Sequence, residues 1–553
     1  MGSAMSAFAA ARKASDSADS DVAAPLLSNG VANPDDHYPY WRVNRSPPSD
    51  LEDGEGNFGP DPQEEEEEEE EEGDWLVGDR FVDEASRLLH LTLPVFLTNV
   101  LLCLLALISM GFVGHLGAVE LASAAIAVTM FNVIGRAVVI GLAGGLETIC
   151  GQAYGAGQYT QLGDALQRGI AILSLVAVPL AAILLFLERI LLFFRQDPDL
   201  AAHAQVYSRW LIPGLFAQAW STPMEKYLQS QGEVVALMVA AGFTLFLHVP
   251  GNWLLMRTLK LGFVGPAIAT SLSMFCYPLF IFAYILWSGI HKKSWTGWSL
   301  RTCLRRWGPF FRLSLPACVM VCLEWWCFEF TVLLAGLLPD PDVQVAALVI
   351  VINVGYLCYM FPMGLSSAVT IRVSNELGAG NPARAKLVAK TVVFIALSTA
   401  LCLAALLLAL RNVLPALFTG DDADELRVRQ LASRLIPLLA LLQVTDFCQA
   451  TLGGVVRGSG RQVVGAVVNF GAFYLVAIPV GALLSFNFGW GAVGIWAGQD
   501  VGSLAQLICL VVFVVTLDWQ GEARRAKDLV TQGGKDEEAT AVLVAKPSLG
   551  VEQ

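Results

Sequence analysis

The sequence is short of charged residues: Asp, Glu, Lys and Arg make up 15% of its 553 residues, against a hydrophobic share of 55% and a mean hydropathy of +0.57. This composition excludes a soluble globular enzyme. The net charge of −14 is confined to one end, because residues 1–78 hold twenty acidic and four basic side chains and the remaining chain is almost neutral. An acidic soluble protein that mimics nucleic acid is therefore excluded as well.

Cysteine pairs and histidine clusters are also missing. The eleven cysteines are spread singly without a CxxC pair, and the six histidines are scattered. Neither a disulfide framework nor a zinc site is indicated. Residues 1–78 lack the apolar core of a secretory signal, and no catalytic constellation, phosphate loop or metal motif occurs. We expect no enzymatic activity, no cofactor and no nucleic-acid partner.

Long apolar stretches fill the chain after residue 78. A helix of about 20 apolar residues spans a bilayer, and lipid admits only helices or closed barrels. The stretches do not alternate with period two, which excludes a barrel. We predict an all-α polytopic membrane protein with 12 transmembrane helices at residues 91–114, 120–145, 165–188, 206–229, 233–255, 262–287, 313–337, 345–370, 386–410, 430–454, 462–484 and 491–516.

The twelve predicted spans fall into two similar halves. Six spans per half is an even number, so the halves share one orientation and are related by an axis along the membrane normal. We predict two pseudo-symmetric six-helix lobes, an architecture typical of secondary transporters. The repeated anchors, 222 to 229 residues apart, are Pro94 and Pro316, GAGQ at 155–158 and GAGN at 378–381, LIP at 211–213 and 435–437, Pro250 and Pro479, and GFVG at 262–265 and GAVG at 491–494.

The charges of the short loops predict the orientation. Basic loops stay in the cytosol, so both termini are expected to be cytosolic. The basic residues lie between spans six and seven, between spans eight and nine and after span twelve: Lys292, Lys293, Arg301, Arg305, Arg306, Arg372, Arg384, Lys386, Arg524, Arg525 and Lys527. The acidic residues lie between spans seven and eight and between spans nine and ten: Asp340, Asp342, Asp421, Asp422, Asp424 and Glu425.

The ends of the chain differ from its apolar body. Residues 1–78 are rich in Ser, Asp, Pro and Gly and contain nine consecutive glutamates, which repel one another and bury no apolar surface, so we expect a disordered acidic cytosolic tail. The other expected divisions are an N-terminal six-helix lobe at 79–290, a cytosolic linker at 291–311, a C-terminal six-helix lobe at 312–517 and a cytosolic tail at 518–553.

Two acidic residues lie deep in predicted spans. Glu324 is about 12 residues from either end of span seven, which places it about 18 Å deep at 1.5 Å per residue, and Asp446 lies within about two turns of the middle of span ten. Such carboxylates are costly in a bilayer and usually mark ion or proton paths. The alternative is a protonated acid that bonds to a neighbouring helix. We favour the functional reading, because both acids belong to the same half.

Three sequence blocks resemble the signature blocks of plant-type MATE (multidrug and toxic compound extrusion) transporters. They are LETICGQAYGA at 146–156, CLEWW at 322–326 and RVSNELGAG at 372–380, and the likeness runs from about residue 85 to about 520. The resemblance implies two six-helix lobes that export organic solutes in exchange for protons or sodium. The loop that characterises major facilitator transporters is replaced here by the first block, which argues against that family.

The resemblance also implies roles for individual residues. In plant MATE proteins proton coupling is assigned to the Glu of the CLEWW block and to an Asp eleven residues before an Arg-Gly-x-Gly turn, which here are Glu324 and Asp446. Many bacterial relatives carry an Asp in span one that binds the coupling ion, whereas this chain has Ser109. This departure favours a proton site in the C-terminal half.

Several polar residues near this pair are further candidates. Glu329 lies five residues after Glu324, about 140° around the helix, and is the second choice for coupling. Gln449 lies three residues after Asp446, on about the same helix face. Each cavity-lining candidate alone is more often a bond between helices than a ligand contact: Asn353, Tyr356, Gln443 and Gln449.

The sequence therefore predicts a secondary active efflux transporter that exchanges organic solutes for protons by alternating access. The solutes expected are secondary metabolites, xenobiotics or organic anions, and the coupling ion is H⁺. An anion-conducting channel or a sensor on the same scaffold is the alternative. We expect a monomer in the vacuolar or plasma membrane, whose partners are the lipid bilayer and a small organic solute.

Overall fold

The computed structural model describes residues 78–295, 297–420 and 422–531, and these ranges contain helices and turns but no strand. The expectations for the acidic N-terminal tail and for the last part of the C-terminal tail lie outside the described residues. The all-helical prediction is confirmed, as expected for a chain whose backbone polar groups must be satisfied inside lipid.

The first half of the chain begins with a helix that starts twelve residues before the predicted span. The elements are α3 (Asp79–Gly114), α4 (Ala118–Met130), η1 (Phe131–Arg136), α5 (Ala137–Gly155), α6 (Tyr159–Leu184), α7 (Leu187–Phe193), α8 (Pro198–Ser230), α9 (Val234–Trp253), η2 (Leu254–Thr258), η3 (Gly262–Val264) and α10 (Gly265–Ser288).

A short connection leads to the second half. It holds η4 (Ile290–Lys293) and α11 (Leu300–Leu304). A further helix covers residues 519–531. The elements between are α12 (Trp307–Ala335), α13 (Pro341–Gly378), α14 (Pro382–Ala409), η5 (Pro415–Leu417), α15 (Ala423–Gly458), α16 (Gln462–Asn469), η6 (Phe470–Ala477), α17 (Ile478–Ala482), η7 (Leu483–Asn487) and α18 (Ala492–Val515).

The predicted number of spans is close to the number of apolar helices. In the part of the chain that the structure describes, eleven helices are long and apolar enough to cross a membrane. The predicted span at 206–229 lies in α8, which has 33 residues but is more polar. Its polar side chains Gln205, Ser208 and Ser221 are buried within the protein rather than presented to lipid. This explains how α8 can be long enough to span a membrane although its hydropathy is lower than that of the other predicted spans.

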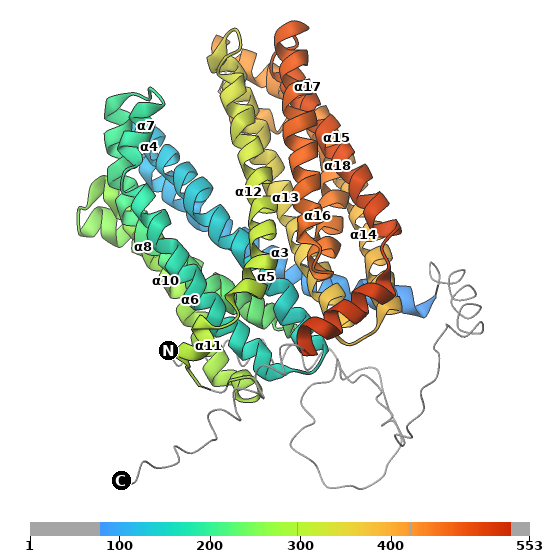
Figure 1. Ribbon diagram of the computed structural model, residues 1–553. Coiled ribbons are helices and arrows are strands. Elements are labelled where there is room, and N and C mark those ends of the chain that lie inside the picture. The colour runs from blue at the N-terminus through green and yellow to red at the C-terminus, as the bar shows by residue number, and fades with distance from the viewer. Residues whose placement is uncertain (1–77, 296, 421, 532–553) are drawn as a thin grey trace, which may run out of the picture. The chain divides into compact units, whose positions relative to one another are not determined.

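The helices form two bundles that correspond to the two halves of the chain (Figure 1). Helices α4 to α10 make up one bundle and α13 to α18 the other. The bundles come together at the end where α11 and the last helix lie, and they diverge toward the opposite end (Figure 1). The prediction of two pseudo-symmetric six-helix lobes is confirmed.

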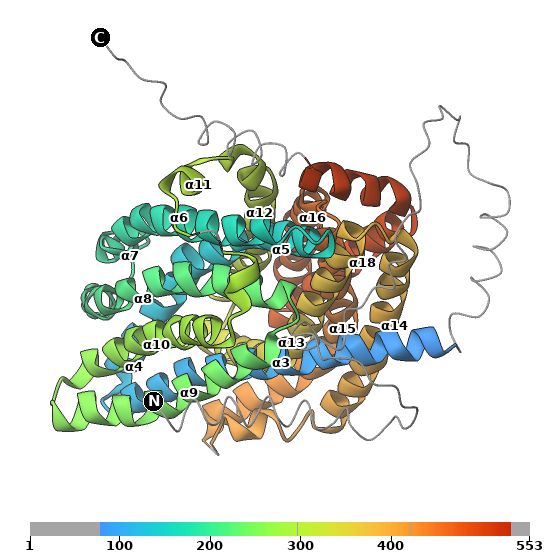
Figure 2. The same cartoon turned by 90° about the horizontal axis from the view of Figure 1, so that it is seen from below.

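The first helix of each half packs partly on the opposite lobe. Leu88 and Leu91 of α3 are buried in a cluster with Leu365 of α13, and the view from below shows α3 running beneath α13 toward α14 (Figure 2). In the same way, Phe310 and Cys318 of α12 belong to the apolar cluster of the N-terminal lobe. The lobes are therefore tied by two helices that pack on both of them, and the predicted domain boundaries, which follow chain order, stay predictions.

Glycines allow the backbones of the two lobes to touch at equivalent positions. A Cβ atom on Gly155 would overlap the carbonyl oxygen of Asn375, and a Cβ atom on Gly378 would overlap that of Gln152. The amides of the same two residues make matching bonds, Asn375 Nδ2 to the Ser230 carbonyl at 3.1 Å and Gln152 Nε2 to the carbonyl of residue 458 at 3.5 Å. The repeated GAG motifs are thus explained by close helix approach about the pseudo-twofold axis.

Candidate functional site

The structure brings Glu324 and Asp446 together inside the C-terminal lobe. The Tyr359 hydroxyl on α13 donates a hydrogen bond to Oε1 of Glu324 at 2.8 Å. Asp446 on α15 is 7% exposed, and its Oδ1 lies 3.0 Å from the Ser503 hydroxyl on α18. The Gln449 side chain interacts with both carboxyl groups. Four helices therefore converge on one buried polar cluster.

A third acid, Asp500 of α18, adjoins this cluster and was missed in the sequence. It is 7% exposed, both of its carboxylate oxygens are buried without a hydrogen-bond partner, and it interacts electrostatically with Asp446. An unpartnered buried carboxyl is costly, so its retention needs a reason. The rule that identified Glu324, an acid inside an apolar span, would have identified Asp500 as well.

The other predicted candidates are placed differently. Glu329 is exposed on α12, and no described residue pairs with it. Asn353 and Tyr356 are exposed on α13, where the Tyr356 hydroxyl lies within electrostatic reach of Arg136 of the N-terminal lobe. Gln443 is buried on α15 with its Oε1 unpartnered. The cluster thus contains Gln449 but not Glu329, and the cavity-lining roles stay predictions.

The N-terminal lobe holds a neutral polar network at the position of the missing acid. Ser109 Oγ lies 3.0 Å from His248 Nε2 and 2.9 Å from Thr270 Oγ1. A cavity of about 100 Å³ beside this network is also lined by Arg136 and Glu225. Both charged residues lie within long helices and were missed in the sequence, although charge inside an apolar span is the signal that identifies them.

An ion-pair network joins the two lobes at the end where they meet. Glu147 of α5 pairs with Lys226 of α8 at 2.5 Å and with Arg457 of α15 at 3.2 Å. Arg457 also donates to the Ser366 hydroxyl at 2.7 Å, and its charge acts on Glu324. We call Glu147, Lys226 and Arg457 the latch. It connects the deep acids to the contact between the lobes.

A second buried ion pair fixes α3 on the C-terminal lobe. Arg372 is fully buried in α13, where it donates two 2.8 Å hydrogen bonds to Glu84 of α3 and pairs with Glu376 at 2.7 Å. A buried guanidinium needs such partners. Arg372, which entered the orientation argument as a loop charge, is therefore part of the packing between helices.

None of these clusters resembles a metal centre. Among the described residues, no group of three or more His, Cys, Asp or Glu side chains is arranged to hold a metal ion. What the C-terminal cluster offers is a set of titratable carboxyl groups with hydroxyl and amide partners. Such groups accept and release protons or bind a ligand through hydrogen bonds.

Comparison with known proteins adds to this geometry. The MatE family model matches residues 94–254 and 316–483, one segment in each half. The chain is 37% identical to Protein DETOXIFICATION 16 of Arabidopsis thaliana over 82% of this chain and 93% of that protein. It is 36% identical to Multidrug and toxin extrusion protein 1 of Xenopus tropicalis over 84% of this chain and 79% of that protein.

The fold is shared with a solved structure. The eukaryotic MATE transporter AtDTX14 superposes with a TM-score of 0.78 at 37% sequence identity, over 82% of this chain and 100% of that chain. The agreement covers both lobes, and it therefore includes the helices that carry the buried acids and the latch.

Proposed function

Because this chain belongs to the MATE family of membrane transporters, we propose that it is a proton-coupled antiporter that exports organic solutes, with Glu324 and Asp446 as its coupling pair. The family consists of transporters rather than enzymes, and the protein is an integral membrane protein. The proposal adds the coupling ion, the substrate class and the residues that link the two.

The convergence of Glu324, Asp446 and Gln449 in one lobe carries the proposal. An intramembrane carboxyl is expensive and persists where it serves an ion or proton path. The two groups interact electrostatically and share a contact with Gln449, so a proton bound at one changes the charge that the other experiences. The N-terminal lobe has Ser109 and His248 where bacterial relatives have an acid, and the carboxyl of Glu225, which lines the adjoining cavity, shares that cavity with the basic Arg136.

Antiport requires that proton and substrate favour different states of the carrier. A ligand shifts a conformational equilibrium only by its difference in affinity between the states. When ionised, the pair could hold a cationic or hydrogen-bonding solute. Protonation from the acidic side removes that charge, so the solute is released as the surrounding helices repack.

The latch offers a route from the pair to the lobes. Arg457 lies on α15, the helix that carries Asp446, and its charge acts on Glu324 while its guanidinium binds Glu147 of the opposite lobe. A change in charge at the pair therefore alters the balance of forces on Arg457. Opening of the cytosolic side requires this ion pair to break.

Loop charge supports the remaining parts of the proposal. With the basic loops in the cytosol, the end where the lobes meet faces the cytosol and both termini lie on that side. Either the vacuolar or the plasma membrane then gives an acidic compartment beyond the bilayer into which a cytosolic solute is moved.

Transport by purified protein in lipid vesicles tests the coupling pair. Glu324→Gln and Asp446→Asn keep size and hydrogen bonding but remove titration, so we expect each to abolish solute exchange driven by an imposed pH gradient. Expression and thermal unfolding should stay close to wild type. Glu329→Gln is the matched control: its carboxyl lies on the same helix as Glu324, outside the cluster, and should retain most of the exchange.

The outcomes of these transport assays distinguish the proposed antiporter from a channel. Full exchange in both Glu324→Gln and Asp446→Asn would refute the coupling assignment. A current that persists in the absence of a pH gradient would favour the channel instead. Equal loss in Glu329→Gln would show that the effect does not depend on membership of the cluster.

A further inference from the structure

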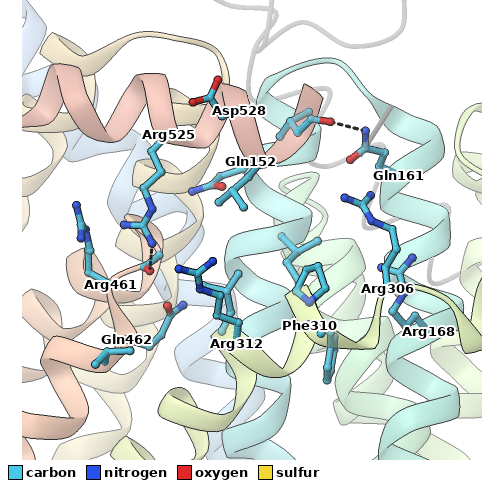
Figure 3. A pocket seen from close by; sticks show the side chains of 18 of the residues that line it. Gln152, Gln161, Arg168, Arg306, Phe310, Arg312, Arg461, Gln462, Arg525 and Asp528 are labelled. Atoms are coloured by element: carbon cyan, nitrogen blue, oxygen red, sulfur yellow. Dashed lines mark hydrogen bonds between the residues drawn. The ribbon is translucent and has the colours of Figure 1, made fainter. Parts of the chain in front are cut away.

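A large basic pocket opens on the face where the two lobes meet. Its volume is about 790 Å³, within the range of ligand-binding pockets. Five segments line it: the end of α5, the start of α6, the start of α12, residues 460–464 and the last helix at 519–531 (Figure 3). The basic residues on its wall are Arg168, Arg306, Arg312, Arg461 and Arg525.

The arginines form two groups on opposite walls (Figure 3). Arg312, Arg461 and Arg525 gather on one wall, and Arg168 and Arg306 lie across from them, with Phe310 between the groups. Asp164 and Asp528 also line the pocket. Basic residues outnumber acidic ones in the lining, and the arginines surround one shared hollow rather than being scattered over the surface. Arg168 is largely buried there, and its Nε donates to the Arg305 carbonyl at 2.8 Å.

The first group shares one carboxylate. Glu522 is buried and pairs with both Arg461 and Arg525, while Arg525 also donates to the Gly460 carbonyl at 3.3 Å. Arg312 is exposed and makes no hydrogen bond or ion pair with the described residues. Burial, and then the neighbouring guanidinium groups of Arg461 and Arg312, lower the pKa of Arg525. The carboxylate of Glu522 opposes this effect.

Retention of basic loops in the cytosol does not account for this arrangement. The positive-inside rule requires basic residues near the membrane, in any position within the cytosolic loops. It does not require guanidinium groups from four segments to surround a hollow. Arginine forks recognise phosphate through paired hydrogen bonds, and a ligand that reaches both walls needs several negative groups.

We propose that this pocket is a cytosolic binding site for a multiply phosphorylated anion, either a soluble polyphosphate or the headgroup of a phosphorylated lipid. Arg312, Arg461 and Arg525 bind one end of the ligand, and Arg168 and Arg306 bind the other. Arg168 belongs to the N-terminal lobe and Arg461 to the C-terminal lobe, so an occupied site bridges the lobes. The ligand thereby favours the conformation in which they meet on this face.

Binding to the full-length protein tests this site without a transport assay. Inositol hexakisphosphate is titrated against protein in detergent micelles, and the same protein is tested in nanodiscs of phosphatidylcholine with and without phosphatidylinositol 4,5-bisphosphate. Tight binding of the first probe identifies a soluble source, and binding confined to the second identifies a lipid source. Sodium sulfate at equal ionic strength controls for general anion screening.

Two variants remove arginines without leaving a buried charge unpaired. Arg312→Gln removes an exposed cation that has no described partner, and Arg525→Gln leaves Glu522 paired with Arg461. Each should weaken binding of the effective probe by about threefold to tenfold, as exposed charge contacts do, and Arg312→Lys, which keeps the charge but not the paired donors, should restore only part of it. Arg384→Gln, an exposed arginine outside the pocket, should bind like wild type.

The negative outcomes are equally definite. The proposal is wrong if neither probe binds the wild-type protein above the sulfate control. It is also wrong if Arg384→Gln weakens binding as much as Arg312→Gln. Because solute exchange is not measured, neither result bears on the coupling assignment of Glu324 and Asp446.

Discussion

At the scale of single residues, the charged groups inside the protein fall into two kinds. Arg372 and Glu147 each pair with two charged side chains, and these ion pairs include contacts between helices of different halves. Asp500 and Arg136 keep polar atoms that are buried without a partner. Paired groups fix one arrangement of the helices, whereas unpaired groups remain able to interact with a proton, a solute or a partner in another conformation.

Breaking the latch should loosen the cytosolic closure. Glu147→Gln removes the charge that binds both Lys226 and Arg457, which should shift the balance between the closed and open forms by about 1–2 kcal/mol, or about fivefold to thirtyfold. A cysteine at the buried Ser459 reports the change. We expect maleimide to label Ser459→Cys faster from the cytosolic side when Glu147→Gln is present, with the exposed Cys402 and Cys509 replaced by serine.

A control for this effect is available within one lobe. Glu233 accepts a hydrogen bond from Tyr284 at 2.8 Å, and both residues belong to the N-terminal half. Glu233→Gln should leave the labelling rate of Ser459→Cys unchanged. If the two glutamine variants label at the same rate, the latch does not hold the lobes together.

At the scale of helices, the sequence predicted where most helices lie but not which side chains contact one another between them. Apolar length located the spans, because a helix needs about 20 apolar residues to cross a bilayer, and the repeated anchors divided the spans into two halves. The predicted span began at residue 91, because the first twelve residues of α3 include the charged Asp83, Glu84 and Arg87 and are too polar for an apolar span. Glu84 is buried only because Arg372 reaches it from α13, 288 positions away, and no local pattern reveals such a pair.

The same limit applies to the candidate site. Glu324 and Asp446 can each be recognised in the sequence as an acidic residue within an apolar stretch, and the same criterion applies to Asp500. That Tyr359 binds Glu324, that Ser503 lies beside Asp446 and that Gln449 contacts both acids depend on the packing of four helices. The sequence identified the chemistry, and the fold supplied the contacts.

The glycine contacts between helices predict matched effects in the two halves. Gly155→Ala and Gly378→Ala each place a Cβ against a backbone carbonyl of the other lobe. Overpacking of this kind costs about 1–3 kcal/mol, so both should lower the midpoint of thermal unfolding in detergent by similar amounts. Gly242→Ala in α9, where no atom lies within 4 Å of an added Cβ, is the control. Equal midpoints for all three variants would contradict the close approach.

At the scale of the whole molecule, two lobes are held by contacts concentrated at one end. The latch, the glycine contacts and the basic pocket all lie where the bundles meet, and the bundles diverge toward the other end (Figure 1). The structure therefore represents a form that is closed on the face carrying the basic loops. In the alternating-access mechanism proposed above, the opposite form requires the latch and the glycine contacts to separate together.

Accessibility labelling tests the orientation on which this description depends. Single cysteines at Lys292 and at Glu425 should be modified by an impermeant reagent from opposite sides of the membrane, because their loops carry opposite charge. Permeabilised vesicles, in which both positions should react, provide the control. Modification of both positions from one side would overturn the topology.

The exchanged packing of α3 has a consequence for synthesis. Leu88 is made early, but its neighbour Leu365 follows roughly 280 residues later, and at about 5–20 residues per second the wait is about 15–55 s. During that time α3 can pack on α9 of its own half, but the side of α3 that contacts α13 is uncovered and Glu84 lacks its partner Arg372. The nascent first lobe therefore depends on lipid or on the insertion machinery to shelter its leading helix until the second half of the chain emerges.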